Sequence, residues 1–251
     1  AWVAAFVAPA QPHATRPRRQ SGHEVLVQAR AGRREMDHRR NLATIGANGG
    51  EESTETQPKV AMVGEVARPH CVVRKLVLTV EPGLQLPALA FVPQKANGRA
   101  VLYLHDAGMK HDAAPGGPID ALVDQGCVVL AAELRGIGET ETGFRRRAYG
   151  AGRFGRDLLE VLTAYLMGKN YIGMRTDDVT AWARYLQSSA LTNEAPSDIR
   201  LIAHGKVAVP ALHAAALDRK SFDEITLHKM IPSWEAIVAA EETFDQPANV
   251  V

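Results

Sequence analysis

The sequence predicts an α/β fold: a mostly parallel sheet with helices on both faces, preceded by a β-hairpin. Two runs of apolar residues, 99–104 and 127–132, are typical of strands buried on both faces of a parallel sheet. Segments with helical periodicity alternate with these strands, which favours right-handed crossover connections. Before them, 72–81 and 86–92 alternate in hydrophobicity around the turn residues Pro82 and Gly83, a pattern that indicates a hairpin.

The helices are predicted from apolar spacing and from residues that begin or end helices. A first helix is expected over 118–125, ended by Gly126. A second has one apolar face, formed by Leu158, Leu159, Leu162, Tyr165 and Leu166. A third should begin at Thr176 as N-cap, with Asp177 and Asp178 in its first turn, where carboxylates suit the helix dipole. Its buried stripe is predicted to be Val179, Trp182, Ala183 and Leu186.

The remaining chain continues the alternation of strand and helix. Strands are expected over 199–203 and 225–227, with an alanine-rich helix over 210–217 between them. Another helix is predicted to begin at Trp234. A strand that ends the sheet at Leu227 would leave an exposed edge, which invites pairing with a partner or with further sequence.

Composition and charge favour one globular domain. The 251 residues are 46% hydrophobic and 23% charged, with a formal net charge of +1. This charge argues against nucleic-acid or membrane partners, and no apolar run reaches the roughly 20 residues of a spanning helix. Residues 1–58 are predicted to be a poorly structured basic leader, because their basic residues are all arginines without interleaved aromatics. Residues 59–251 are predicted to form the α/β domain. Nothing in the sequence assigns a compartment.

Three loops follow predicted strands at the carboxyl edge of the sheet, where open α/β sheets place their sites. The first is His-Asp-Ala-Gly at 105–108. The second is Glu-Leu-Arg-Gly-Ile-Gly-Glu-Thr at 133–140, and the third is Ala-His-Gly-Lys-Val-Ala at 203–208.

Together these loops resemble the α/β-hydrolase family, in particular its acetyl-xylan-esterase-like and dienelactone-hydrolase-like members. The family's His-Gly-x-Gly loop, its D-x-R-G-x-G loop and its G-x-S-x-G nucleophile elbow match in order and spacing, over roughly residues 72–251. The segments 173–178 and 211–218 also read like that group. The resemblance implies a carboxylic-ester hydrolase, with a small ester or an acetylated carbohydrate as ligand. It implies no cofactor and no metal.

The elbow departs from the family pattern at the residue that would carry the chemistry. Acyl transfer needs a hydroxyl or thiol at this turn, beside a histidine base and a pair of backbone amides. The serine position aligns with Gly205, and Ala203 and Val207 replace the flanking glycines. The N–H groups of Lys206 and Ala107 remain as candidates for the oxyanion hole that the resemblance implies.

The acid and the histidine base have no clear counterparts. Only positions 228–251 follow the last predicted strand, whereas two further βα units of about 30 residues each would be needed. His105, His204 and His228 lie near strand ends and are candidates for a substitute base, although a structural role is favoured for each. Glu235 is a candidate acid, with a solvated helix residue as the favoured interpretation. Glu133 and Arg135 are interpreted as bracing their loop.

Two further patterns are weighed and set aside. Gly150 to Gly155 matches G-x-G-x-x-G, but no strand precedes it, so a glycine loop is favoured over a dinucleotide site. His105, His111 and Asp112 are close in sequence on a Gly/Pro-rich loop with no ligand-like period, so a metal site is not predicted.

Three functions therefore stay open from the sequence. The first is an ester hydrolase by descent. The second is a pseudo-hydrolase, which keeps the fold as a binding or structural lobe without an acyl-enzyme step. The third is a nucleotide-dependent oxidoreductase, which rests only on the glycine pattern. Because Gly205 has no nucleophile, we expect the chain to cleave esters poorly or not at all.

Overall fold

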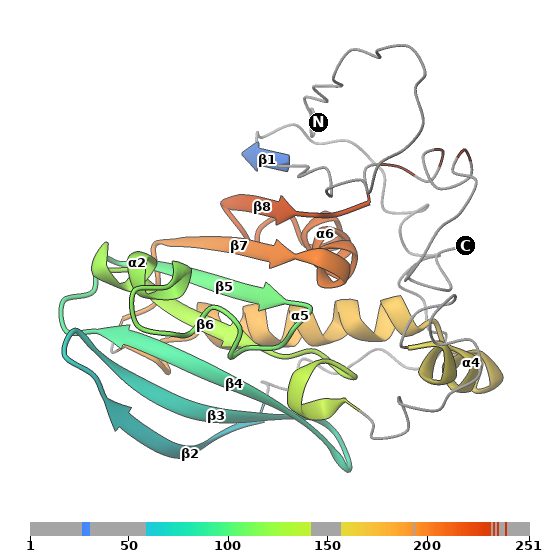
Figure 1. Ribbon diagram of the computed structural model, residues 1–251, viewed down its shortest axis with the longest axis horizontal. Helices are drawn as coiled ribbons and strands as arrows, with labels where there is room; N and C mark the ends of the chain where they lie inside the picture. Colours follow the sequence, from blue (N-terminus) through green and yellow to red (C-terminus); the bar gives the residue numbers. More distant parts are fainter. Residues whose placement is uncertain are drawn as a thin grey trace, which may run out of the picture.

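The computed structural model describes residues 27–30, 59–141, 157–192, 194–231, 233, 235 and 239. Eight strands of the described residues form one sheet in the order β1-β8-β7-β5-β6-β4-β3-β2 (Figure 1). The strands are β1 (Val27–Arg30), β2 (Lys59–Ala67), β3 (Cys71–Glu81), β4 (Leu84–Pro93), β5 (Arg99–His105), β6 (Val128–Ala132), β7 (Asp198–His204) and β8 (Glu224–His228). The helices are α2 (Pro118–Asp124), α4 (Leu158–Leu166), α5 (Tyr171–Gln187) and α6 (Ala208–Leu217), with 3-10 turns η1 (Gly138–Thr140) and η3 (Gly205–Val207).

The central strands are parallel, as the sequence predicts. β5 pairs in parallel with β6 and β7, and β7 pairs in parallel with β8. The predicted hairpin is β3 and β4, which is antiparallel and joins the sheet through β6. β2 was not predicted; it pairs antiparallel with β3 and widens the hairpin into three strands.

The predicted open edge at β8 is wrong for this structure. The backbone of β1 pairs antiparallel with β8, from Val27 opposite Leu227 to Arg30 opposite Glu224. These four residues belong to the segment predicted to be a poorly structured leader, and the rest of that segment lies outside the described residues. Figure 1 shows β1 beside β8 at the end of the sheet.

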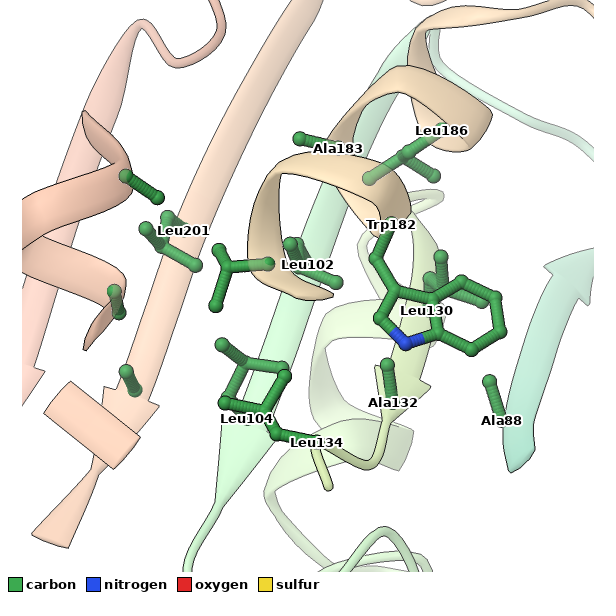
Figure 2. Packing of buried hydrophobic residues seen from close by; sticks show 14 of the residues in the cluster. Ala88, Leu102, Leu104, Leu130, Ala132, Leu134, Trp182, Ala183, Leu186 and Leu201 are labelled. Atoms are coloured by element: carbon green, nitrogen blue, oxygen red, sulfur yellow. The ribbon is translucent and has the colours of Figure 1, made fainter. Parts of the chain in front are cut away.

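Helices cover both faces of the sheet because the strand side chains alternate between two apolar layers. Leu102 and Leu104 of β5 pack in the layer that contains buried residues of α5 and α6. Val101 and Tyr103 of the same strand pack in the other layer, with Ile119 of α2. In Figure 2 the indole ring of Trp182, from α5, lies over the first layer.

Two helix predictions need correction. The third predicted helix begins at Tyr171 rather than after Thr176, because the Asn170 side chain accepts hydrogen bonds from the amides of Ile172 and Gly173 as its N-cap. Thr176 lies inside α5 and donates its hydroxyl to the Ile172 carbonyl, so Asp177 and Asp178 are mid-helix. The predicted stripe of Val179, Trp182, Ala183 and Leu186 is buried, as expected.

The apolar face predicted for α4 is largely exposed. Val161 and Ala164 are the buried residues of this helix, and they pack against Tyr171 at the start of α5. Leu159, Leu162, Tyr165 and Leu166 lie on its exposed side. No helix within the described ranges is both long and apolar enough to cross a bilayer.

Candidate active site

The three loops singled out from the sequence meet at the carboxyl edge of the sheet. The loop after β5 is joined to the end of β7, since the Asp106 amide donates to the His204 carbonyl at 3.2 Å. It is joined to the loop after β6 by Glu133, whose carboxylate accepts hydrogen bonds from the amides of Met109 (3.2 Å) and Glu139 (2.7 Å). One surface of the sheet edge thus presents residues that lie up to 100 positions apart in sequence.

Gly205 forms the sharp turn between β7 and α6. Its φ angle is +72°, in the left-handed region that side chains with a Cβ rarely adopt. η3 follows at once, and Val207 and Ala208 pack into the core below the turn. A strained turn between a strand and a helix is the backbone form of a nucleophile elbow. Gly205 is therefore the apex of a tight turn between β7 and η3.

The space beside Gly205 belongs to Asp106. A Cβ added to Gly205 would fall on the Asp106 carboxylate, so no side chain fits at position 205 while Asp106 keeps its place. The Asp106 Oδ2 atom accepts a hydrogen bond from the Lys206 amide at 3.3 Å. The carboxylate therefore lies where an elbow side chain would begin.

Both candidate oxyanion amides have acceptors within the protein. The Lys206 N–H donates to Asp106, as described, and the Ala107 N–H donates to Nδ1 of His105 at 2.9 Å. An oxyanion hole requires donors aimed at the reacting oxygen. A ligand oxygen that used these two amides would have to displace the side chains of Asp106 and His105.

Glu133 and Arg135 brace the loops, as the sequence analysis proposed, but they do so through separate partners. Burial raises the pKa of Glu133, and the amides of Glu139 and Met109 partly oppose this shift. The Arg135 guanidinium donates two hydrogen bonds to the Asp178 carboxylate, at 2.9 and 2.6 Å, and one to Glu81 at 3.0 Å. Burial favours loss of the Arg135 proton, but the hydrogen bonds with Asp178 outweigh it and raise its pKa.

Histidines form a stacked row along the same edge, which the sequence analysis did not foresee. His105, His204 and His228 are cross-strand neighbours in register at the ends of β5, β7 and β8. The rings of His204 and His228 lie 4.2 Å apart, and those of His105 and His204 lie 5.2 Å apart. Burial lowers the pKa of His204 to about 4, with the nearby His228 and His105 acting in the same direction. In the sequence, the feature that could have predicted this row is that each of the three histidines lies at the end of a predicted strand.

The other candidates contribute less to this region. Glu235 is an exposed residue near the end of the described part of the chain, and a hydrogen bond with Ser233 lowers its pKa. The glycine pattern of 150–155 lies outside the described residues. The helix predicted to begin at Trp234 lies almost entirely outside them as well.

Comparison with solved structures gives the fold. A Bacteroides fragilis protein named as a candidate acetyl xylan esterase superposes with a TM-score of 0.55, at 15% identity over 73% of this chain and 49% of that one. Acetyl xylan esterase 1 from Thermoanaerobacterium gives a TM-score of 0.47 at 16% identity, over 75% of this chain and 57% of that one. An acetyl xylan esterase from Paenibacillus gives 0.46 at 18% identity, over 72% and 55%.

The chain therefore has the α/β-hydrolase fold, as its sequence predicts. The three matched structures are named as acetyl xylan esterases. The chain spans about half the length of each, between 49% and 57%. No family model matches the sequence, and no curated protein matches it.

Proposed function

We propose that this chain is a pseudo-hydrolase: an esterase-like α/β-hydrolase fold whose elbow binds or scaffolds but forms no acyl-enzyme. The observation that supports this most directly is the Asp106 carboxylate beside Gly205. A glycine offers no nucleophile, and the carboxylate takes the space that a nucleophilic side chain would need.

Two departures from the family pattern are complementary. The resemblance implies glycine after the histidine of the first loop and serine at the elbow, whereas this chain has Asp106 and Gly205. A side chain at 205 would need the Asp106 carboxylate to leave its present place, so the two departures meet at one point of the turn. This pairing favours a site that lost acyl transfer as a unit.

The ligand class proposed for this edge is a small ester or an acetylated carbohydrate, in line with the names of the matched structures. The alternative is an ester hydrolase. The chain covers 49% of the first matched structure. An ester hydrolase would need a nucleophile other than Gly205.

Wild-type chain is expected to release p-nitrophenolate from p-nitrophenyl acetate no faster than the buffer does, and to show no burst. A stoichiometric burst, or turnover that disappears on mutation of a single histidine, would overturn the proposal. The assay tests the absence of acyl transfer directly, and circular dichroism of the same sample confirms that the chain is folded.

A cysteine placed at the elbow tests the geometry separately. Gly205→Cys alone should be destabilised by about 1–2 kcal/mol from the left-handed backbone, with the conflict with Asp106 added. Asp106→Gly/Gly205→Cys should be more stable than the single variant and should react much faster with iodoacetamide, because a thiolate at a helix N-terminus is activated. The native cysteines, Cys71 and Cys127, are both buried and give a low background. Equal reactivity and stability of the single and double variants would show that Asp106 does not fill the elbow.

A further inference from the structure

Three side chains with metal-ligating atoms converge next to the elbow. His105, His111 and Asp112 each offer one ligand atom, and these atoms all lie within 4.8 Å of one another. The Asp112 carboxylate faces both imidazoles: Oδ1 lies 2.9 Å from Nδ1 of His111, and Oδ2 lies 3.9 Å from Nε2 of His105. The two rings stack at 4.0 Å with planes 13° apart, so one ring must turn before the in-plane nitrogens of both can meet one ion.

The fold brings His105, His111 and Asp112 together, although their spacing in the sequence did not predict a metal site. His105 ends β5, and the chain then makes a compact turn in which the His111 amide donates to the Gly108 carbonyl at 3.2 Å. This turn brings His111 and Asp112 back over the end of the strand that carries His105. The three residues thus form a cluster although they have no regular period on one helix or strand.

A second layer of polar groups orients two of these side chains. The Tyr103 hydroxyl donates to Oδ2 of Asp112 at 2.7 Å. Oδ1 of Asp106 lies 3.3 Å from Nδ1 of His105, the ring nitrogen that would carry the proton if Nε2 bound a cation. Metal-binding histidines commonly donate this second N–H to a carboxylate, and metal-binding carboxylates are themselves hydrogen-bonded.

The charge states suit a cation at neutral pH. Burial lowers the pKa of His105, with His111 acting in the same direction, so its imidazole is neutral and can coordinate. Burial would raise the pKa of Asp112, but hydrogen bonds with Tyr103 and His111 outweigh it and lower the pKa. Asp112 therefore stays ionised as the anionic ligand.

We propose that His105, His111 and Asp112 form a binding site for a divalent transition-metal ion, with Zn²⁺ the best match. Two imidazoles and one carboxylate are ligands that zinc accepts, and a three-residue set leaves a coordination position for water or a small anion. In a tetrahedral zinc site the ligand atoms lie about 3.3 Å apart. The His105–Asp112 separation of 3.9 Å must therefore shrink, and the His111–Asp112 pair at 2.9 Å must open and exchange its hydrogen bond for the ion. The half-exposed His111 side chain, at 50% exposure, has room to move.

Occupancy of this site would change the elbow. With Nε2 of His105 on the cation, Nδ1 becomes a donor to Asp106 and can no longer accept the Ala107 amide. The Ala107 amide, one of the two candidate oxyanion amides, would then need another acceptor.

The test is a zinc titration of chelator-treated, untagged chain by isothermal calorimetry and by competition with a chromogenic chelator. We expect about one equivalent of Zn²⁺ per chain from the three-residue set. His111→Ala and Asp112→Asn should each weaken binding at least tenfold, and Tyr103→Phe should weaken it by about tenfold through loss of the supporting hydrogen bond. The matched control is His70→Ala, an exposed histidine on the loop before β3, which should bind as wild type does.

Two results would overturn the site. One is the absence of zinc binding by folded wild-type chain at about tenfold excess over protein. The other is binding that His111→Ala, Asp112→Asn and His70→Ala weaken equally, which would place the ion elsewhere. Asp112→Asn keeps an oxygen that can accept the Tyr103 hydroxyl, so its effect is separable from misfolding, and thermal melts of each variant without metal complete the comparison.

Discussion

Asp178→Ala is expected to lower the free energy of unfolding by about 3–5 kcal/mol, because it leaves the buried Arg135 guanidinium without its main partner. Asp178 is 0% exposed and Arg135 is 6% exposed. The carboxylate accepts three hydrogen bonds from Arg135: from its backbone amide at 3.0 Å, from Nε at 2.9 Å and from Nη2 at 2.6 Å. Guanidinium chloride denaturation followed by circular dichroism measures the loss.

Two comparisons separate the effect of an unpaired charge from the effect of any ion pair. Arg135→Met/Asp178→Leu removes both charges and should recover a large part of the lost stability, since well-packed apolar replacements are often neutral. Lys110→Ala breaks an ion pair with Glu139 whose side chains are 70% and 49% exposed, and should cost no more than about 1 kcal/mol. Equal losses for Asp178→Ala and Lys110→Ala would contradict the buried-charge explanation.

The burial of Asp178 and the true start of α5 were not predicted from the sequence. The pattern of Thr176, Asp177 and Asp178 reads as a helix start, and the local chemistry of that interpretation is sound. The true N-cap, Asn170, precedes Thr176 by nearly two turns of helix. Asp178 is buried where it meets Arg135, which lies in a loop 43 residues away. Local propensity cannot specify such a partner, since the partner is set by how α5 crosses the sheet.

The buried strands were predictable for the opposite reason. Runs such as 100–104 and 127–132 are apolar along their whole length, a composition typical of a strand covered on both faces. β2 was missed because its side chains are mostly exposed, so the alternation that marks a half-buried strand is absent from its sequence. The apolar side of α4 misled the burial prediction, since the helix contacts α5 through Val161 and Ala164 instead.

At the candidate site, the sequence indicated which loops matter but not which of their residues contact one another. The turn at Gly205 and the loop at 105–108 were each singled out from their motifs. That Asp106 lies against Gly205 depends on β5 and β7 being adjacent and in register, with His105 opposite His204. The same register aligns the histidine row. Contacts between residues 100 positions apart, as between Asp106 and Lys206, follow from the sheet order and not from spacing.

Trp182→Ala is expected to cost about 3–5 kcal/mol of stability, which is the range for removing a large aromatic side chain from a core. Trp182 is 0% exposed, and its indole lies beside Leu130, Ala132 and Ala88 (Figure 2). Its Nε1–H also donates to the Glu133 carbonyl at 3.1 Å, at the base of the loop that ties the candidate site together. The cavity and the unpaired carbonyl therefore add to each other.

The contributions of the Trp182–Glu133 hydrogen bond and of the Trp182 packing to stability can be measured separately. Trp182→Phe keeps much of the apolar volume and loses the donor, so it should cost clearly less than Trp182→Ala, and the difference reports the cavity. Tyr165→Ala removes an aromatic ring that is 69% exposed on α4 and should change stability by no more than about 0.5 kcal/mol. Chemical denaturation at one temperature compares all three variants. If Trp182→Ala were as mild as Tyr165→Ala, α5 would not be packed on the sheet as described, and its hydrogen bond to the Glu133 carbonyl would have to be abandoned with it.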